Sequence, residues 1–104
     1  MTGRITLPSK YASETILAAF DFTSNLAISE TISTQVCTCA VFSGTDASPS
    51  SVISGSATAS GTVVSQKLTG GVLGVMYNVT CTITTSLGQT LAIQALLAII
   101  PTTI

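Results

Sequence analysis

The sequence predicts an all-β protein, an antiparallel immunoglobulin-like β-sandwich of about seven strands with an extended N-terminal arm. Turn-forming Ser, Asn, Gly and Pro recur along the 104 residues, and the segments between them are short and rich in Val, Ile and Thr. These residues fit a pleated strand better than a helix. In addition, residues 77–85 alternate strictly between apolar and polar side chains, which is the period of a strand. The length suffices for one domain around one core.

Residues 1–11 are expected to form an arm outside the sandwich, which then spans residues 12–104 as a single domain. Pro8 excludes a regular helix in this segment, and the basic residues Arg4 and Lys10 lie on either side of it. The segment also lacks the apolar run of a signal peptide. Such an arm would dock in an extended form and become ordered only on binding.

Several strands are expected between the arm and residue 69. Apolar residues alternate along one face of the first run, residues 15–22: Ile16, Ala18, Phe20 and Phe22. Helix propensity leaves a short helix over TILAAF as the alternative for this run. Residues 32–42 form a second β run of mixed pattern. The stretch GTDASPSSVISG, residues 44–55, predicts a corner followed by a short strand, and residues 62–68 add a longer one.

The clearest strand, residues 77–85, leads into a predicted hairpin. Its odd positions are expected to face the core and its even positions the other side: Tyr77, Val79, Cys81 and Ile83 inward, Asn78, Thr80, Thr82 and Thr84 outward. Gly88 in the loop at residues 86–89 tolerates positive φ. The partner strand, residues 90–100, is apolar on both faces because it also carries Leu96 and Ile100. Such a strand lies under a covering layer or against another subunit.

Charged residues are scarce in this composition. Hydrophobic residues make up 46% of the chain and charged residues 7%, whereas about 25% of an ordinary domain is charged. The net charge is −1 and the three basic residues do not cluster, so no nucleic-acid partner is expected. The longest apolar run, residues 91–100, is too short for a membrane-spanning helix. A neutral, hydroxyl-rich surface does not oppose ordered assembly.

Three uses are open to the cysteines, Cys37, Cys39 and Cys81. Structural zinc needs four N or S ligands, and the chain offers three cysteines and no histidine, so no metal or other cofactor is expected. Cys81 could form an inter-sheet disulfide with Cys37 or Cys39, as in antibody domains, but the Trp of those domains is absent. The favoured interpretation is three reduced, buried thiols in a reducing compartment.

We find no catalytic motif. The four acids, Glu14, Asp21, Glu30 and Asp46, lie in different segments, and histidine, the usual general base near neutral pH, is missing. The glycines of residues 70–74 lack the Lys-Ser/Thr and the helix of a phosphate loop. The sequon at Asn78 arises easily by chance in a Thr-rich strand. We therefore expect neither an enzyme nor a small-molecule substrate.

Ordered motifs over most of the chain resemble those of a known family. They are Phe20-Asp21-Phe22; GTDASPS at 44–50 with Gly55; GTVVSQ at 61–66; GGVLGVMY at 70–77; and TSLGQTL at 85–91. In this order they resemble small virion proteins of tailed bacteriophages, the phage fiber-tail adaptors. Each motif consists of turn and strand residues, so the resemblance rests on their order. The arm lies outside it.

The resemblance implies a non-enzymatic structural component of a bacteriophage virion, an adaptor that links tail and fiber through protein–protein contacts. The alternative is a cement or decoration protein of the phage capsid. The expected partners are tail and fiber proteins and copies of the chain itself, in the tail region of a virion assembled in the bacterial cytoplasm. From the arm and the apolar last strand, the expected interface residues are Arg4, Leu7, Pro8, Leu96 and Ile100.

Overall fold

The computed structural model describes the backbone of residues 2–6 and residues 10–100 in full. Strands make up most of this part of the chain, so the expected all-β class is confirmed. The elements are β1 (Thr2–Thr6), β2 (Lys10–Tyr11), β3 (Thr15–Asp21), the 3-10 turn η1 (Thr23–Asn25), β4 (Ile32–Ser43), the 3-10 turn η2 (Pro49–Val52), β5 (Ile53–Ser60), β6 (Val63–Thr69), β7 (Met76–Thr85) and β8 (Thr90–Ile100). Within the described residues, no helix is long and apolar enough to cross a membrane.

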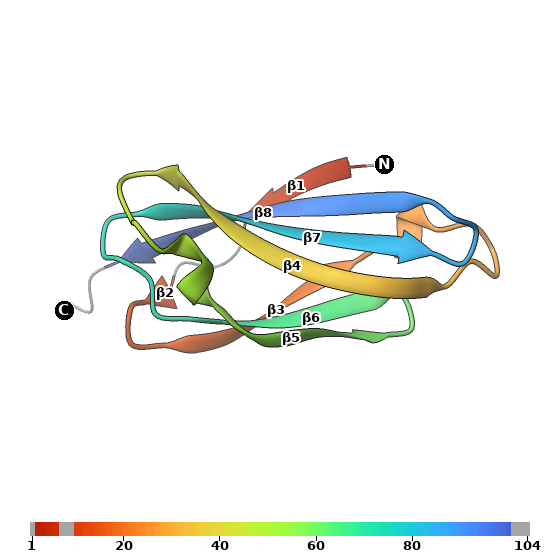
Figure 1. Cartoon of the computed structure of the whole chain (residues 1–104), viewed down its shortest axis with the longest axis horizontal. Helices are drawn as coiled ribbons and strands as arrows, with labels where there is room; N and C mark the ends of the chain where they lie inside the picture. Colours follow the sequence, from red (N-terminus) through yellow and green to blue (C-terminus); the bar gives the residue numbers. More distant parts are fainter. Residues whose placement is uncertain (1, 7–9, 101–104) are drawn as a thin grey trace.

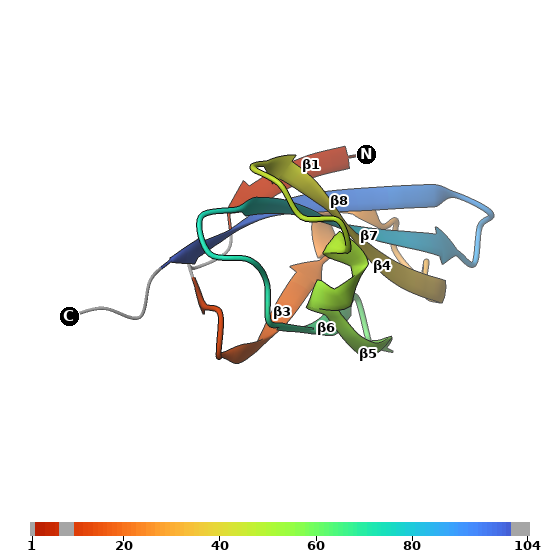
Figure 2. The ribbon, with the colours of Figure 1, turned by 60° about the vertical axis from the view of Figure 1, so that its left-hand side comes forward.

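The strands form two sheets that pack face to face (Figures 1 and 2). The five-stranded sheet has the order β1-β8-β7-β4, with β2 also paired to β8, and the three-stranded sheet has the order β3-β6-β5. The pairs of β1 and β2 with β8 are parallel, and the other pairs are antiparallel. The sandwich is therefore confirmed, while its immunoglobulin-like character stays a prediction.

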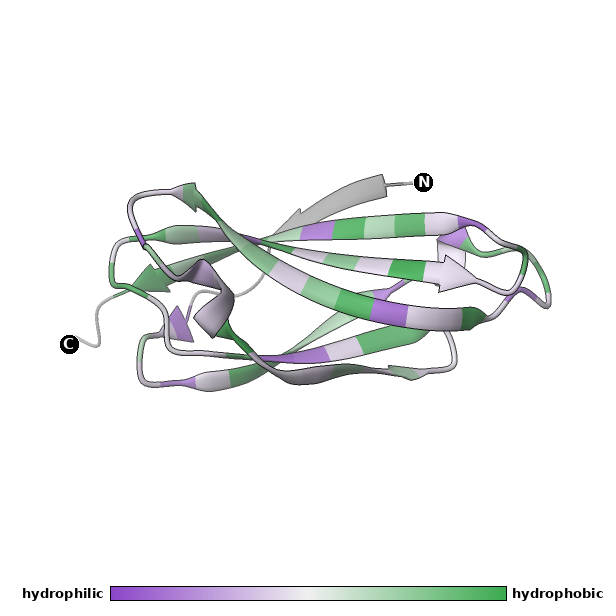
Figure 3. Ribbon diagram, in the orientation of Figure 1, coloured by the Kyte–Doolittle hydropathy of each residue, from purple (hydrophilic) through white to green (hydrophobic). Residues whose placement is uncertain are grey.

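The β7–β8 hairpin follows from the alternation of its side chains, which Figure 3 shows as alternating hydropathy along both strands. Tyr77 lies opposite Leu97 and Cys81 opposite Ile93, and all four side chains are buried. In the loop, the N–H of Gly88 donates to the carbonyl of Thr85 at 3.0 Å. The predicted inward and outward faces of β7 are thus confirmed.

The hydrophobic core fills the space between the two sheets. Its side chains with no exposed surface come from both layers and from η2: Phe20, Phe22, Val52, Val64, Leu68, Tyr77, Val79, Cys81, Ala95, Ile83 and Leu97. The alternative of a helix over TILAAF is wrong, because β3 pairs with β6 along its full length and buries alternate residues. In the stretch of residues 44–55, the corner and the strand after it are confirmed, and Val52 is buried beneath them.

The N-terminal segment differs from the expected arm. Both β1 and β2 pair in parallel with β8, from Thr2 opposite Ala92 to Tyr11 opposite Ile100. An uncovered β8 would present a row of unpaired N–H and C=O groups, and these two strands bond to that edge instead. The expectation that these strands gain order only on binding is therefore corrected. The division of the chain into an arm and a sandwich domain stays a prediction.

Candidate functional site

The described members of the expected interface lie along one edge of the five-stranded sheet. Arg4 belongs to β1, and Leu96 and Ile100 belong to β8, to which both N-terminal strands are paired. Leu96 is partly exposed, and Ile100 is exposed. Leu7 and Pro8 lie outside the described residues. The structure thus groups three of the five residues, and their role as an interface remains to be tested.

The side of the five-stranded sheet that faces away from the core, here called the outer face, carries no charged side chain on β4, β7 or β8 within the described part of the chain. The register aligns its residues in rows across the three strands, for example Ala40, Asn78 and Leu96. Its members are Thr34, Val36, Thr38 and Ala40 of β4, Met76, Asn78, Thr80, Thr82 and Thr84 of β7, and Ala92, Gln94, Leu96, Ala98 and Ile100 of β8. The surface is therefore built from methyl, hydroxyl and amide groups.

One pair of hydroxyl groups on the outer face is hydrogen-bonded across two strands, whereas apolar groups are left uncovered. The hydroxyls of Thr34 and Thr84 are hydrogen-bonded to each other across β4 and β7. Val36, two residues along β4, is 56% exposed. The Oδ1 atom of Asn78 is buried without a hydrogen-bond partner. Across β4, β7 and β8 such a face can bind a partner by shape and apolar contact, because these three strands present no charge that must first lose its water.

Besides the N-terminal strands β1 and β2, which pair only with β8, three strands in the described part of the chain lie at sheet ends and pair on one side only: β4 in the five-stranded sheet, and β3 and β5 in the three-stranded sheet. The β8 edge, in contrast, is covered by β1 and β2. End strands present backbone donors and acceptors to which another chain can add a strand. The sandwich therefore offers open edges next to its uncharged outer face.

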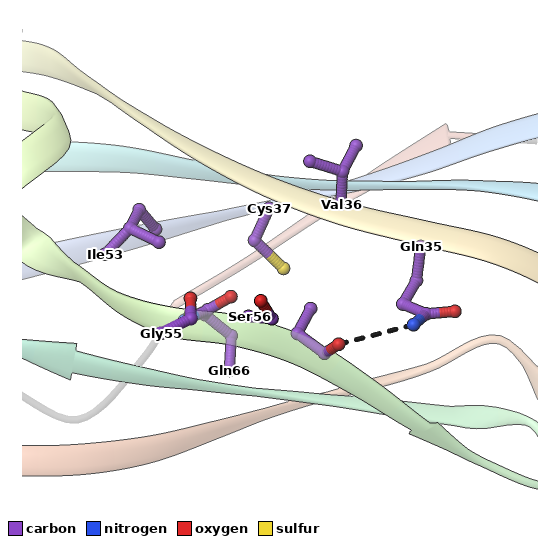
Figure 4. Close-up of a pocket in the computed structure, with 8 residues that line it drawn as sticks. Gln35, Val36, Cys37, Ile53, Gly55, Ser56 and Gln66 are labelled. Atoms are coloured by element: carbon purple, nitrogen blue, oxygen red, sulfur yellow. Dashed lines mark hydrogen bonds between the residues drawn. The ribbon is translucent and has the colours of Figure 1, made fainter.

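A pocket of about 320 Å³ opens between the end strands β4 and β5. In Figure 4, the sulfur of Cys37 points from β4 toward β5, and the Gln35 amide donates to the carbonyl of Ala57 at 3.3 Å. The thiol is the one ionisable group among the residues that line the pocket: Gln35, Val36, Cys37, Ile53, Gly55, Ser56, Ala57 and Gln66. The pocket thus lacks the paired acids or bases of a catalytic site.

The floor of this pocket depends on Gln66, which is 1% exposed. The register of β5 against β6 shifts between Ser54 and Thr58. Over this irregularity the amide nitrogen of Gln66 donates to the carbonyl of Ser54 at 3.0 Å and lies 3.2 Å from that of Gly55. The side chain therefore replaces ladder bonds that the backbone does not make, which is a structural role.

All three cysteines lie in the five-stranded sheet, are buried and are free thiols in the structure. Cys37 in β4 lies directly opposite Cys81 in β7, and Cys39 lies opposite Val79. The alternative of an inter-sheet disulfide is therefore wrong, because no cysteine belongs to the other sheet. The hydrogen bond with Cys37, together with burial, raises the pKa of Cys81, and burial raises the pKa of Cys39 to about 11. These two thiols are protonated near neutral pH, and their redox state in solution stays a prediction.

Each of the four acids accepts a hydrogen bond close to a turn. The bonds are from the Tyr11 N–H to Glu14 (2.7 Å), from the Thr23 N–H to Asp21 (2.9 Å), from the Ala27 N–H to Glu30 (2.9 Å), and from the Ser48 N–H to Asp46 (2.8 Å). Hydroxyl donors, Thr23, Thr85 and Tyr77 respectively, are the main cause that lowers the pKa of Asp21, Glu30 and Asp46. No group of three His, Cys, Asp or Glu suited to hold a metal occurs in the described residues. The acids thus stabilise turns.

Two polar anchors were not predicted from the sequence. The Tyr77 hydroxyl donates to Asp46 at 2.6 Å and accepts from the Val72 N–H at 2.8 Å, which ties two loops to β7. Lys10 is 1% exposed, and its Nζ donates to the carbonyls of Tyr11 at 2.8 Å and Glu14 at 2.7 Å. Burial lowers the pKa of Lys10. The burial of Lys10, two residues after Pro8, could not be predicted from the sequence, because its hydrogen-bond acceptors are backbone carbonyls.

Comparison with known proteins identifies a family for this chain. A family model described as podophage GP4 fiber-tail adaptor protein gp77 matches residues 10–98. The comparisons with curated proteins and with solved structures gave no match. The matched region runs from the start of β2 to two residues before the end of β8, and so contains nearly all of the outer face. The resemblance noted in the sequence is thereby confirmed, and the chain belongs to the podophage GP4 fiber-tail adaptor family Gp77.

Proposed function

We propose that this chain is a non-enzymatic link between the tail and the fibers of a podophage virion and works through protein–protein contacts of its outer face and strand edges. Its membership of a fiber-tail adaptor family supports a structural role in the tail. The observation that carries the proposal is the outer face, where β4, β7 and β8 present no charged side chain in the described part of the chain.

An uncharged outer face is suited to a permanent contact. Exposed protein surfaces usually carry many charged side chains of both signs, which keep copies apart. Burying a charged group is expensive unless it is paired, whereas methyl and hydroxyl groups are buried with little loss. The exposed side chain of Val36 and the partly exposed side chain of Leu96 lie at opposite sides of this face, on β4 and β8. A partner that covers both strands would bury apolar surface with no charge to desolvate.

The partners in this proposal are tail and fiber proteins and further copies of the chain. The open edges of β3, β4 and β5 support it, because a partner can extend either sheet with a strand of its own. The residues proposed for the interface are Arg4, Leu7, Pro8, Leu96 and Ile100, together with the outer face. Assembly would take place in the host cytoplasm and place the chain in the tail region of the virion.

The location of the chain in the particle separates this function from its alternative. Imaging of whole particles that carry a labelled form of the chain should show density next to the tail. Density on the capsid lattice would instead identify a cement or decoration protein. Loss of fibers, with intact heads and tails, from particles made without the chain would support the linking role, and fully fibered particles would contradict it.

A pair of matched substitutions tests the outer face itself. Leu96→Glu places a charge on the outer face, and Ile28→Glu places the same charge between η1 and β4, where Ile28 is 97% exposed and belongs to no strand. Both variants should fold, as circular dichroism would verify. We expect Leu96→Glu to abolish incorporation into particles and Ile28→Glu to leave it unchanged. Equal incorporation of the two variants would remove the outer face from the proposed interface.

A further inference from the structure

β1 is held to the sandwich through one neighbour. It stands at the end of the sheet order, pairs with β8 alone, and finds its main contacts there. Figure 1 shows it at the rim of the five-stranded sheet, next to β8. The ladder joins Thr2–Thr6 to Ala92–Leu96 in parallel. A strand attached by one backbone ladder can leave its sheet without dismantling the core.

The strand that follows is anchored in a different way. β2 also pairs with β8, with Lys10 opposite Ile99. However, the buried Nζ of Lys10 additionally donates to two carbonyls, those of Tyr11 and Glu14. Both carbonyls belong to the same local segment and would move with β2, but withdrawing this strand would take the Lys10 side chain, which is 1% exposed, out of its buried position. The boundary between a detachable segment and a fixed one thus falls between β1 and β2.

Three residues, Leu7-Pro8-Ser9, connect the two strands in the sequence. A connection of this length reaches at most about 10–15 Å. Any second β8 edge that receives β1 must therefore lie beside the first.

From this arrangement we infer that β1 exchanges between copies, so that β1 of one copy pairs in register with β8 of the neighbouring copy. The exchanged ladder contains the same backbone bonds as the internal one, so exchange costs little beyond the entropy of association. Only 7% of the residues are charged, so repulsion between copies is weak. The exchange would place the β8 edges, with Leu96 and Ile100, side by side. The inference rests on the assembly role proposed above.

A disulfide trap distinguishes exchange from internal pairing. Arg4 lies opposite Gln94 in the ladder, so Arg4→Cys and Gln94→Cys are made as two separate single variants. The two purified proteins are mixed at high concentration, treated with oxidised glutathione and run on a non-reducing gel. We expect a disulfide-linked heterodimer, whose 4–94 bond is identified by peptide mass. The control mixes Arg4→Cys with Thr34→Cys, which lies on β4 at the opposite end of the sheet and is exposed.

Exchange predicts several-fold more heterodimer with Gln94→Cys than with Thr34→Cys. Equal yields overturn the inference, as does an Arg4→Cys/Gln94→Cys double variant that closes its disulfide solely within single chains. Edge contact between two β1 strands without exchange would instead give homodimers of Arg4→Cys, which also overturns it. If either variant fails to fold, Thr2→Cys and Ala92→Cys form the next register pair on the same ladder. The test uses purified protein, so its outcome is independent of where the chain lies in the particle.

Discussion

Gly71 lies in a tight contact at the end of the sandwich where the loop before β7 meets β8. Its φ is +100°, in the region that favours glycine, and a Cβ there would lie 2.8 Å from Cδ1 and Cγ1 of Ile99 and 3.3 Å from Cε2 of Tyr77. Ile99 is 2% exposed and Tyr77 is fully buried. Neither neighbour has free volume into which it can move, because protein cores are close-packed.

We therefore expect Gly71→Ala to destabilise the fold through two additive effects. A left-handed backbone costs a residue with a Cβ about 1–2 kcal/mol, and inserting a group into a packed site costs about 1–3 kcal/mol. The free energy of unfolding should fall by about 2–5 kcal/mol. Gly74→Ala is the matched control: its φ is +84°, but its Cβ would meet nothing within 4 Å. The free energy of unfolding of the Gly74→Ala control should fall by about 1–2 kcal/mol, because only the left-handed backbone conformation disfavours the new side chain.

Urea unfolding followed by circular dichroism measures both changes. A double variant, Gly71→Ala with Ile99→Val, removes the Cδ1 atom that the new methyl group meets. Its loss of stability should be smaller than the sum of the two single losses, because the two residues are in contact. Equal losses for Gly71→Ala and Gly74→Ala, or strict additivity in the double variant, would refute the packing argument.

Four further predictions concern the core, the Tyr77–Asp46 anchor at acid and at alkaline pH, and the thiols. Ile83→Ala should lower the free energy of unfolding by about 2–5 kcal/mol, because it opens a cavity between the sheets, whereas Thr82→Ala on the outer face should lower it by under about 1 kcal/mol. Equal shifts of the unfolding midpoint in denaturant melts would contradict the assignment of faces. The hydrogen bond from the Tyr77 hydroxyl lowers the pKa of Asp46 in the folded protein. The stability that ionised Asp46 contributes is therefore present above the pKa of an unfolded carboxyl, near 3.9, and is lost as pH falls through the folded pKa. When the urea midpoint of unfolding is measured against pH, Asp46→Asn should lose less stability in acid than the unchanged protein, and an identical loss would contradict this. Burial raises the pKa of Tyr77 to about 12 from 10.0, so stability should fall as pH rises across this range, and tyrosine absorbance should show one of the two phenols ionising late. Alkylation after non-reducing denaturation should modify all three cysteines by intact mass, and a product with one modified thiol would establish a disulfide.

Local alternation was sufficient to predict the centre of the five-stranded sheet. From Tyr77 to Thr84 of β7 the apolar and polar side chains alternate, and the short loop after β7 brings β8 back as its antiparallel partner. A pattern of period two specifies which side faces the core, since a shift by one residue would bury the hydroxyls. The corner at residues 44–55 was predicted for a similar reason, because glycine and proline restrict the backbone locally.

Contacts between distant segments could not be predicted in the same way. The pairing of β1 with β8 uses backbone atoms that every sequence provides, so Thr2–Thr6 carried no signal for it. The bond from Tyr77 to Asp46 joins β7 to the loop after β4, and the sequence alone does not bring these two segments together. Of the candidate interface, Leu96 and Ile100 were predicted because β8 is apolar on both faces, whereas the absence of charge across β4, β7 and β8 of the outer face required their register.

The ladder between β1 and β8 has a consequence for the order of folding. It joins Thr2 to Ala92, so its formation must wait until almost all of the described chain has emerged from the ribosome. Closing so long a loop is slow compared with forming the β7–β8 hairpin, because contacts between distant residues carry a larger entropy of closure. During that interval β8 already stands beside β7 with one edge uncovered. β1 of a neighbouring nascent copy can then reach this edge before the chain's own β1 does. Whether β8 pairs with its own β1 or with that of another copy would therefore depend on the local concentration of copies during synthesis.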